Sequence, residues 1–283
     1  MTGHPVTGII DAHQHFWRID RGDYGWLTPV LAPLYRDFMP EHLAPLLQRH
    51  GVVGTVLVQA APTEAETGFL LELADRTPFV RGVVGWVDLE RPDAPGRIAA
   101  LAAHPKLAGL RPMVQDIAAD DWLLRPDLAP ALAAMVAHDL AFDALVLPRH
   151  LKRLAALRDR HPDLRIVLDH GGKPAIRDGA FSAWAEDIAG LAADGRSCCK
   201  LSGLLTEAAA GAEAAELRPY VEHLLACFGR DRLIFGSDWP VLTLAGSYGA
   251  WIGMVRGFLA GLDAAERAAV LGGNAERVYR LRA

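Results

Sequence analysis

Eight short apolar runs are distributed along the whole chain. Each is nearly continuous in aliphatic and β-branched residues, the pattern of parallel strands that are covered on both faces. They are residues 9–13, 55–59, 80–88, 107–112, 142–147, 165–170, 198–203 and 233–237. The pattern predicts eight buried strands.

Alanine- and leucine-rich stretches with helical spacing separate most of these runs. One begins at Thr63, where Thr63-Glu64-Ala65-Glu66 fits a capping box with the Thr63 oxygen and the Glu66 carboxylate as the capping groups. Others cover about residues 127–138, 150–160, 182–193 and 213–228. Alternating strands and helices predict an α/β protein with a parallel sheet. The length of 283 residues suits one domain, residues 1–283, folded as a distorted (β/α)8 TIM barrel. A doubly wound open sheet uses the same pattern.

Polar side chains follow several of the predicted strands at the point where each strand ends. His13 and His15 end the first run, two residues apart, so they are expected on one face of the strand. His170 ends the sixth run and Asp238 follows the eighth. Active sites of such barrels lie at the carboxyl ends of the strands. This placement favours the barrel and predicts that the four side chains converge on one cavity.

Three histidines and an aspartate are a ligand set that a single Zn²⁺ uses. Asp238, flanked by apolar neighbours, is also the candidate general base, with a structural N-cap as the alternative. Asp11 is expected to face the same side as His13, one step deeper, with a supporting role. Asp169, next to His170, is expected to point towards the helix layer.

Further candidates line the predicted pocket. Arg111 offers a planar fork suited to carboxylate or polyol oxygens. Gln59, Trp86, His150 and Lys173 are candidates for its wall, with ordinary packing as the alternative. The long segment between residues 15 and 41 is rich in aromatic residues and predicts a lid or a pocket wall.

Composition narrows the class of protein and of partner. A hydrophobic fraction of 51% with 22% charged residues indicates a large core. The net charge is −5 without a basic run, which argues against nucleic acid and favours a small-molecule substrate. No apolar segment approaches the roughly 18 residues of a membrane helix, and the amino terminus lacks a signal pattern. We expect a cytoplasmic protein without a membrane partner.

Four segments carry a family resemblance. They read DAHQHFW from residue 11, LDHGGKP from 168, KLSG from 200 and IFGSDWP from 234. Together they resemble the amidohydrolase superfamily, in its amidohydrolase-related group, and most of all the L-fuconolactonase-like branch that opens sugar lactones. The resemblance implies a carbohydrate-catabolic hydrolase that adds water to a lactone carbonyl.

The resemblance also implies roles for the four residues. Asp238 would activate the water, while His13, His15 and His170 would hold a divalent metal, zinc first among them, or polarise the carbonyl directly in a metal-independent enzyme. Two-metal relatives carry a carboxylated lysine at the end of the fourth strand, where this chain has Arg111, so one metal or none is expected. A metal-dependent decarboxylase of the same superfamily and a non-catalytic binding protein are the alternatives.

Overall fold

Eight parallel strands form one sheet whose order follows the sequence in the computed structural model, which describes residues 8–281. The amino-terminal residues that bear on a signal segment lie outside this range. The strands are β1 (Ile9–Gln14), β2 (Val52–Val58), β3 (Val80–Gly85), β4 (Leu107–Leu110), β5 (Ala141–Ala144), β6 (Ile166–Leu168), β7 (Cys198–Leu201) and β8 (Leu233–Phe235). All eight predicted runs therefore contain a strand.

Backbone hydrogen bonds join the last strand to the first. The His15 amide donates to the Trp239 carbonyl oxygen at 2.8 Å, and the Asp238 amide donates to the His13 carbonyl oxygen at 2.7 Å. These bonds follow β1 and β8 at their carboxyl ends and close the sheet into a barrel. The open doubly wound sheet is therefore wrong for this chain.

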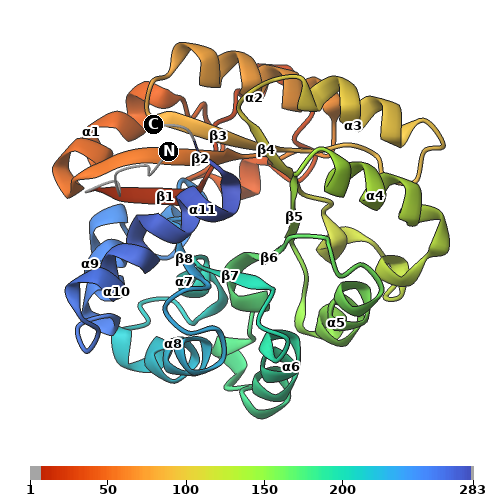
Figure 1. The fold of residues 1–283 in the computed structure, drawn as a ribbon. Helices are drawn as coiled ribbons and strands as arrows, with labels where there is room; N and C mark the ends of the chain where they lie inside the picture. The colour runs from red at the N-terminus through yellow and green to blue at the C-terminus, as the bar shows by residue number, and fades with distance from the viewer. Residues whose placement is uncertain (1–7, 282–283) are drawn as a thin grey trace.

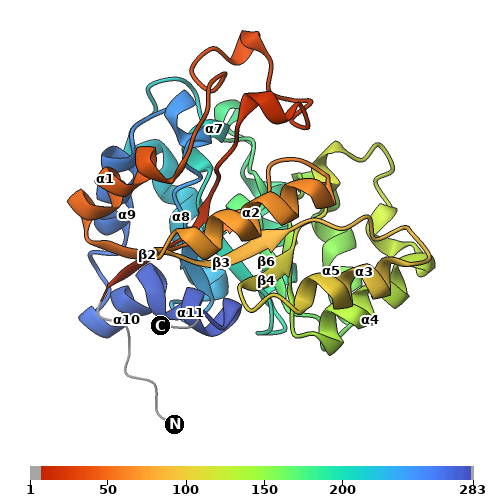
Figure 2. The same cartoon turned by 90° about the horizontal axis from the view of Figure 1, so that it is seen from above.

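Helices surround the barrel and close one end of it (Figure 1). They are α1 (Pro40–His50), α2 (Glu64–Arg76), α3 (Ala94–Ala102), α4 (Ala129–Ala137), α5 (Leu151–Arg160), α6 (Ser182–Ala192), α7 (Leu204–Glu207), α8 (Ala214–Phe228), α9 (Tyr248–Phe258), α10 (Ala264–Ala268) and α11 (Asn274–Tyr279). Within α11, Ala275, Val278 and Tyr279 pack against interior strand residues such as Ile10 and Val56. Figure 2 shows α11 at one end of the barrel and the segment that follows β1 at the other.

None of the helices within residues 8–281 combines the length and the apolar character that crossing a bilayer requires. The predicted helices correspond to α2, α4, α5, α6 and α8. The last of these, α8, has bounds close to those expected. The helix α4 begins two residues later than predicted, because residues 126–128 form a separate 3-10 turn.

An irregularity in β1 decides which side chains enter the barrel. Asp11 pairs with Thr55 and Gln14 pairs with Leu57, so three steps along β1 match two along β2, as in a β-bulge. Ala12 belongs to the interior cluster and Asp11 instead accepts a hydrogen bond from the Tyr248 hydroxyl of α9 at 3.0 Å. The expectation that Asp11 faces the same side of the strand as His13 is wrong, because the register shift after Asp11 separates the two side chains. Its supporting role remains, because it also accepts from the Ser237 amide at 2.8 Å.

The capping box predicted for α2 is half present. The Thr63 hydroxyl oxygen accepts from the Glu66 amide at 3.1 Å, as an N-cap does. The Glu66 carboxylate turns inward instead and accepts from the amides of Ala60 at 3.0 Å and Ala61 at 2.7 Å. Glu66 thereby fixes the loop after β2. Burial raises the pKa of Glu66 to about 7, although the amides of Ala61 and Ala60 lower it.

Glu66→Gln tests this buried carboxyl through the pH dependence of stability. The folded-state pKa of about 7 exceeds the ordinary value of 4.5, so the stabilising contribution is complete below pH 4.5 and is lost as pH rises through 7. Relative to the variant, the free energy of unfolding of the wild type should fall by about 3 kcal/mol over this window. Urea denaturation at several pH values measures the difference. Glu72→Gln, at an exposed position of α2, is the control, and parallel profiles for wild type and Glu66→Gln would contradict the assignment.

Candidate active site

Asp238 lies among three imidazoles at the carboxyl ends of the strands. Its Oδ1 is 3.3 Å from His15 Nε2, 3.7 Å from His13 Nε2 and 3.9 Å from His170 Nε2. All four side chains are buried. They follow or end β1, β6 and β8, so residues more than 200 positions apart in the chain share one cluster.

Left-handed backbone conformations turn two of these side chains into the cluster. His170 has φ 54° and Asp238 has φ 60°, values that are uncommon for residues other than glycine. Gly203 lies directly against the His170 ring, because a Cβ atom at Gly203 would approach His170 Nδ1 to 2.5 Å. Gly203 also has φ +67°, so a larger residue would be strained and would displace the ring. The Ser202 hydroxyl lies 2.9 Å from the same Nδ1.

A buried lysine that the sequence analysis did not identify lies beneath the histidines. Lys200 of β7 donates to His13 Nδ1 at 3.0 Å and to Asp143 Oδ2 at 2.5 Å, and its Nζ lies 3.0 Å from Asp169 Oδ1. The ammonium group thus makes two hydrogen bonds and an ion pair with Asp169. The signal was present in the sequence, since Lys200 and Asp143 are each the one charged residue of a buried strand.

Asp169 faces the barrel interior, so its predicted orientation towards the helix layer is wrong. Val167 belongs to the interior cluster, and strand alternation carries Asp169 to the same face. His170 also reaches the cluster because its left-handed conformation breaks the alternation. Asp169 interacts with His13 Nδ1 at 3.4 Å and with Arg111 Nη1 at 3.4 Å. The neighbouring residues 169 and 170 therefore both contribute to the site.

Outer hydrogen bonds decide where the imidazoles carry their protons. His15 Nδ1 lies 2.8 Å from the Val58 carbonyl oxygen, which only accepts, so Nδ1 is protonated and Nε2 of the neutral ring keeps its lone pair. Lys200 donates to Nδ1 of His13, so the neutral His13 ring carries its proton on Nε2. Towards Asp238, His15 thus presents a lone pair and His13 an N–H donor.

Electrostatics keep His13 and His170 neutral and the Asp238 carboxylate ionised at neutral pH. Burial lowers the pKa of His170 to about 4, against the opposing effect of Asp238. Burial and then Lys200 hold the pKa of His13 well below its usual value. Burial alone would raise the pKa of Asp238, but the adjacent imidazoles, His170 first and then His15, lower it below its usual range. An ionised Asp238 is therefore available to accept a proton.

The cluster suits a single divalent cation. Ligand atoms of His13, His15 and Asp238 all lie within 4.8 Å of one another. The 3.3 Å and 3.7 Å separations from Asp238 Oδ1 resemble the roughly 3.3 Å expected between two ligands that each lie about 2.0–2.1 Å from one zinc ion. His13 can bind a metal through Nε2 only if its ring proton lies on Nδ1. The Asp169 carboxylate can accept a hydrogen bond from that Nδ1–H group, since its Oδ1 lies 3.4 Å away. Lys200 and Asp169 therefore compete for His13 Nδ1.

A cavity of about 240 Å³ opens at Asp238 and is lined in part by Arg111 and Lys173. Gln59 supports Arg111 from behind, accepting from its Nη2 at 3.0 Å, and does not line this cavity. Trp86 lines a second, neighbouring cavity. His150 is buried and lines neither of the two, because its Nδ1 accepts from the Leu147 amide at 3.2 Å.

The segment after β1 forms part of the pocket wall. Trp17 and Phe38 exchange backbone hydrogen bonds of 2.9 and 3.0 Å and pack with their rings 5.3 Å apart. Trp26 donates from Nε1 to the Ala60 carbonyl oxygen at 2.7 Å and lines the cavity at Asp238. Phe38 also contacts Trp239, with ring centroids 5.2 Å apart. These contacts fix the segment as a wall.

Comparison with known proteins agrees with this geometry. The family model described as "Amidohydrolase" matches residues 10–281. The chain belongs to the amidohydrolase family. The recognition of this superfamily from four short segments is thereby confirmed.

Three relatives illustrate the similarity. An L-fucono-1,5-lactonase of Burkholderia ambifaria is 52% identical, with 98% of this chain and 97% of the relative covered. An L-fucono-1,5-lactonase of Burkholderia multivorans is 41% identical, with 96% of each covered. The crystal structure of an amidohydrolase from Burkholderia multivorans with bound Zn is 40% identical, with TM-score 0.92 over 98% of this chain and 100% of that one.

Lys200→Met tests whether the buried ammonium holds the centre of the barrel together. The change leaves Asp143 and Asp169 without their shared cation, and removing one partner of a buried ion pair costs about 3–5 kcal/mol. We expect the free energy of unfolding, measured in urea, to fall by this amount. Lys152→Met, whose side chain is 74% exposed, should change stability by no more than about 0.5 kcal/mol. Equal effects of the two substitutions would contradict this role for Lys200.

Proposed function

We propose that this chain hydrolyses a sugar 1,5-lactone to the open hydroxy acid. The observation that carries the proposal is the ionised Asp238 among three imidazoles at the end of a small cavity. Two relatives named L-fucono-1,5-lactonase, 52% and 41% identical over nearly the whole chain, support the same reaction. A cytoplasmic location and a role in carbohydrate catabolism stay predictions.

Asp238 acts as the general base. A water molecule beside its carboxylate gives up a proton to Asp238 while the water oxygen bonds to the lactone carbonyl carbon. The tetrahedral intermediate then breaks the bond between this carbon and the ring oxygen. The departing alkoxide takes the proton back from Asp238, so the products are a free hydroxyl and a carboxylic acid. The acid then ionises in water to a carboxylate and releases one proton. A lowered pKa suits this role because Asp238 is ionised before each cycle.

Arg111 and His13 stabilise the oxyanion. Among the described residues, Arg111 Nε has no hydrogen-bond partner although it is buried at the cavity. A buried donor without an acceptor is costly, and a substrate oxygen supplies that acceptor. Without a metal, the Nε2 proton of His13 provides a second donor near Asp238; with a metal, His13 Nε2 would be a ligand instead and its proton would lie on Nδ1. Fixed donors in a site that excludes water favour the negative charge that develops on the carbonyl oxygen.

The size and polarity of the first cavity suit one sugar ring. Its volume of about 240 Å³ lies below the roughly 300–1,000 Å³ of pockets for drug-sized ligands. Lys173, Gln115 and Asp116 line it beside the catalytic cluster and offer both donors and acceptors to hydroxyl groups. The Lys173 ammonium donates to Gln115 Oε1 at 2.9 Å, so these side chains are already oriented.

One divalent cation, zinc, would be held by His13, His15 and Asp238. When bound, it supplies a Lewis acid that polarises the carbonyl and lowers the pKa of water. The amidohydrolase structure with bound Zn supports this choice of metal. His170, whose Nδ1 lies 2.9 Å from the Ser202 hydroxyl, lies beside this set with its Nε2 3.9 Å from Asp238 Oδ1.

The lactonase is preferred to the two alternatives. The two named relatives favour it over a decarboxylase. A binding protein has no need of an ionised, buried carboxylate held among imidazoles, because that arrangement costs desolvation energy.

Asp238→Asn should lower kcat for a sugar 1,5-lactone by about 10²–10⁴-fold, because an amide cannot accept the proton. The test follows acid release from a panel of sugar 1,4- and 1,5-lactones with purified wild type and variant. Circular dichroism and the melting temperature check that the variant folds. Asp163→Asn, at an exposed position, is the matched control and should behave as wild type. Normal turnover by Asp238→Asn would require a different base.

Zinc binding can be measured independently of turnover. After incubation with ZnCl₂ and desalting, we expect about one zinc per wild-type chain by elemental analysis. His15→Asn should lose most of it, whereas His138→Asn, at an exposed position, should retain it. Absence of zinc from the wild type would reject the metal assignment. Lactone hydrolysis by the metal-free protein would in addition exclude a metal-dependent decarboxylase as its role.

A further inference from the structure

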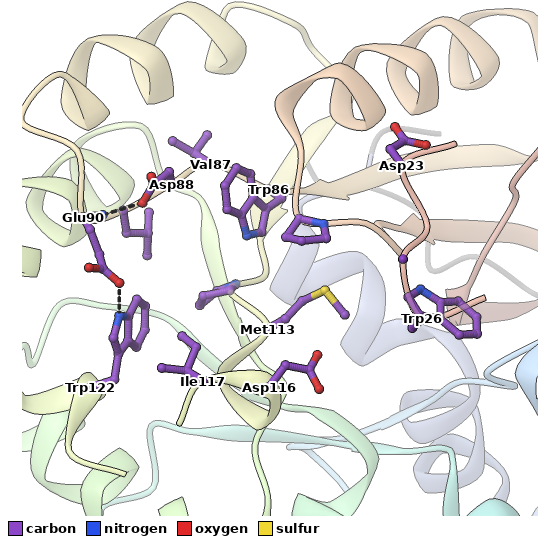
Figure 3. A pocket seen from close by; sticks show the side chains of 14 residues that line it. Asp23, Trp26, Trp86, Val87, Asp88, Glu90, Met113, Asp116, Ile117 and Trp122 are labelled. Carbon is purple, nitrogen blue, oxygen red and sulfur yellow. Dashed lines mark hydrogen bonds between the residues drawn. The ribbon is translucent and has the colours of Figure 1, made fainter. Parts of the chain in front are cut away.

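A second cavity of about 550 Å³ lies next to the catalytic one and has no role in the mechanism above. Its wall comes from the loops after β2, β3 and β4 and from the segment after β1 (Figure 3). Figure 3 shows Trp86 and Trp122 at one part of this cavity and Trp26 at another, with Met113 between them. It is larger than the catalytic cavity and has room for a further sugar ring.

The two cavities are neighbours and share part of their wall. Trp26, Met113 and Asp116 line both of them. Met113 is half-buried and unbranched, and such a side chain changes rotamer at low cost. A ligand whose reacting group lies at Asp238 can therefore extend past Met113 into the second cavity.

The chemistry of the second cavity selects a neutral, hydroxylated ligand. Three indoles and several aliphatic side chains provide flat apolar surface, on which the C–H face of a sugar ring packs well. Four carboxylates line it, from Asp23, Asp88, Glu90 and Asp116, and among the described lining residues there is no lysine, arginine or histidine. Carboxylate oxygens accept hydrogen bonds from hydroxyl groups and repel anions.

Partners already occupy some of these carboxylates. Glu90 accepts from Trp122 Nε1 and from Arg125 Nη1, both at 2.6 Å, so it holds the Trp122 ring in place. Asp116 is exposed at the boundary between the cavities and accepts only a long hydrogen bond of 3.4 Å, from Gln115, among the described contacts. Asp116 is therefore the acceptor best placed for a hydroxyl of a ligand that spans both cavities.

We propose that the second cavity is a subsite for a second, neutral sugar ring joined to the lactone ring. The proposal rests on the proposed lactonase function and extends its substrate class to 1,5-lactones derived from disaccharides. The lactone ring occupies the catalytic cavity, and the glycosyl substituent packs against Trp86 and passes Asp116. The carboxylate that forms on ring opening stays beside Arg111, away from the acidic wall.

The experiment compares three kinds of substrate with the full-length protein. They are a hexose 1,5-lactone, the 1,5-lactones made by oxidising neutral reducing disaccharides with different linkages, and a matching lactone whose second ring is a uronic acid. We expect at least one neutral disaccharide lactone to be hydrolysed with a kcat/KM within about tenfold of the monosaccharide lactone, and the uronic acid analogue to be at least about tenfold poorer than its neutral counterpart.

Two variants test the second cavity, one by filling it and one by removing a packing surface. Ile117 is half-buried and lines only the second cavity, so Ile117→Trp should fill it and lower kcat/KM for disaccharide lactones by about tenfold or more. Trp86→Ala removes a packing surface and should raise KM for the same substrates. Val136→Trp, at an exposed position on α4, controls for the added indole. Monosaccharide lactone turnover by Ile117→Trp shows that the protein is folded.

The outcomes separate this inference from the function on which it rests. Selective loss of disaccharide lactone turnover in Ile117→Trp supports the subsite. Hydrolysis of monosaccharide lactones alone by the wild type overturns the subsite and leaves the lactonase intact. Equal effects of Ile117→Trp on both substrate classes also overturn it. Failure to hydrolyse any lactone overturns the lactonase itself.

Discussion

The ammonium group of Lys200 is the interaction on which the rest of the site depends. A buried cation is tolerated only with charged or hydrogen-bonding partners on all its donors. Lys200 has three such partners, Asp143 at 2.5 Å, Asp169 at 3.0 Å and His13 at 3.0 Å. They come from β5, the end of β6 and β1, so one side chain of β7 ties together three other strands of the barrel.

A chain of polar contacts extends from this ammonium in two directions. Towards the closed end, Asp143 accepts from the Tyr279 hydroxyl of α11 at 2.9 Å. Towards the open end, Asp169 lies 3.4 Å from Arg111, which in turn contacts Gln59. The helix that closes the barrel is therefore connected through polar contacts to Arg111 at the cavity beside Asp238.

Much of this fold could be predicted because buried parallel strands leave continuous apolar runs in the sequence. The strand ends are then the places where polar groups appear, which is why His13, His15, His170 and Asp238 could be grouped. Their distances could not be predicted, since the bulge in β1 has no sequence signal. Strand alternation from Val167 places the Asp169 side chain in the barrel interior. Because His170 also reaches the site, through a left-handed turn that the sequence does not reveal, alternation between the two residues gave the wrong side for Asp169.

Lys200 and Asp143 illustrate a different kind of omission. A lone charge in an apolar run is visible in the sequence, but its partner is set by the register of strands that are distant in the chain. The loops are harder still, because Trp86, Met113 and Trp122 form one wall only after two βα connections, those after β3 and β4, have packed together. The sequence predicts that Gln59 and His150 line the pocket, but their side chains hydrogen-bond to backbone groups instead, Gln59 to the Arg111 carbonyl oxygen and His150 to the Leu147 amide. A polar residue that follows a strand can therefore bind the backbone as readily as a ligand.

The division between a rigid centre and a variable rim has a physical cause. In the centre, Lys200 and its partners satisfy one another, so replacing one of them leaves a buried charge unpaired and is costly. At the rim, Trp86, Met113 and Ile117 line the second cavity with uncharged side chains, so exchanging one of them for another apolar residue unpairs no charge. In the proposed lactonase, the barrel would therefore fix the reacting group of the substrate, while the loops would set the size of the group attached to it. Substitutions at the rim would then change the substrate range without disturbing the proposed proton transfer at Asp238.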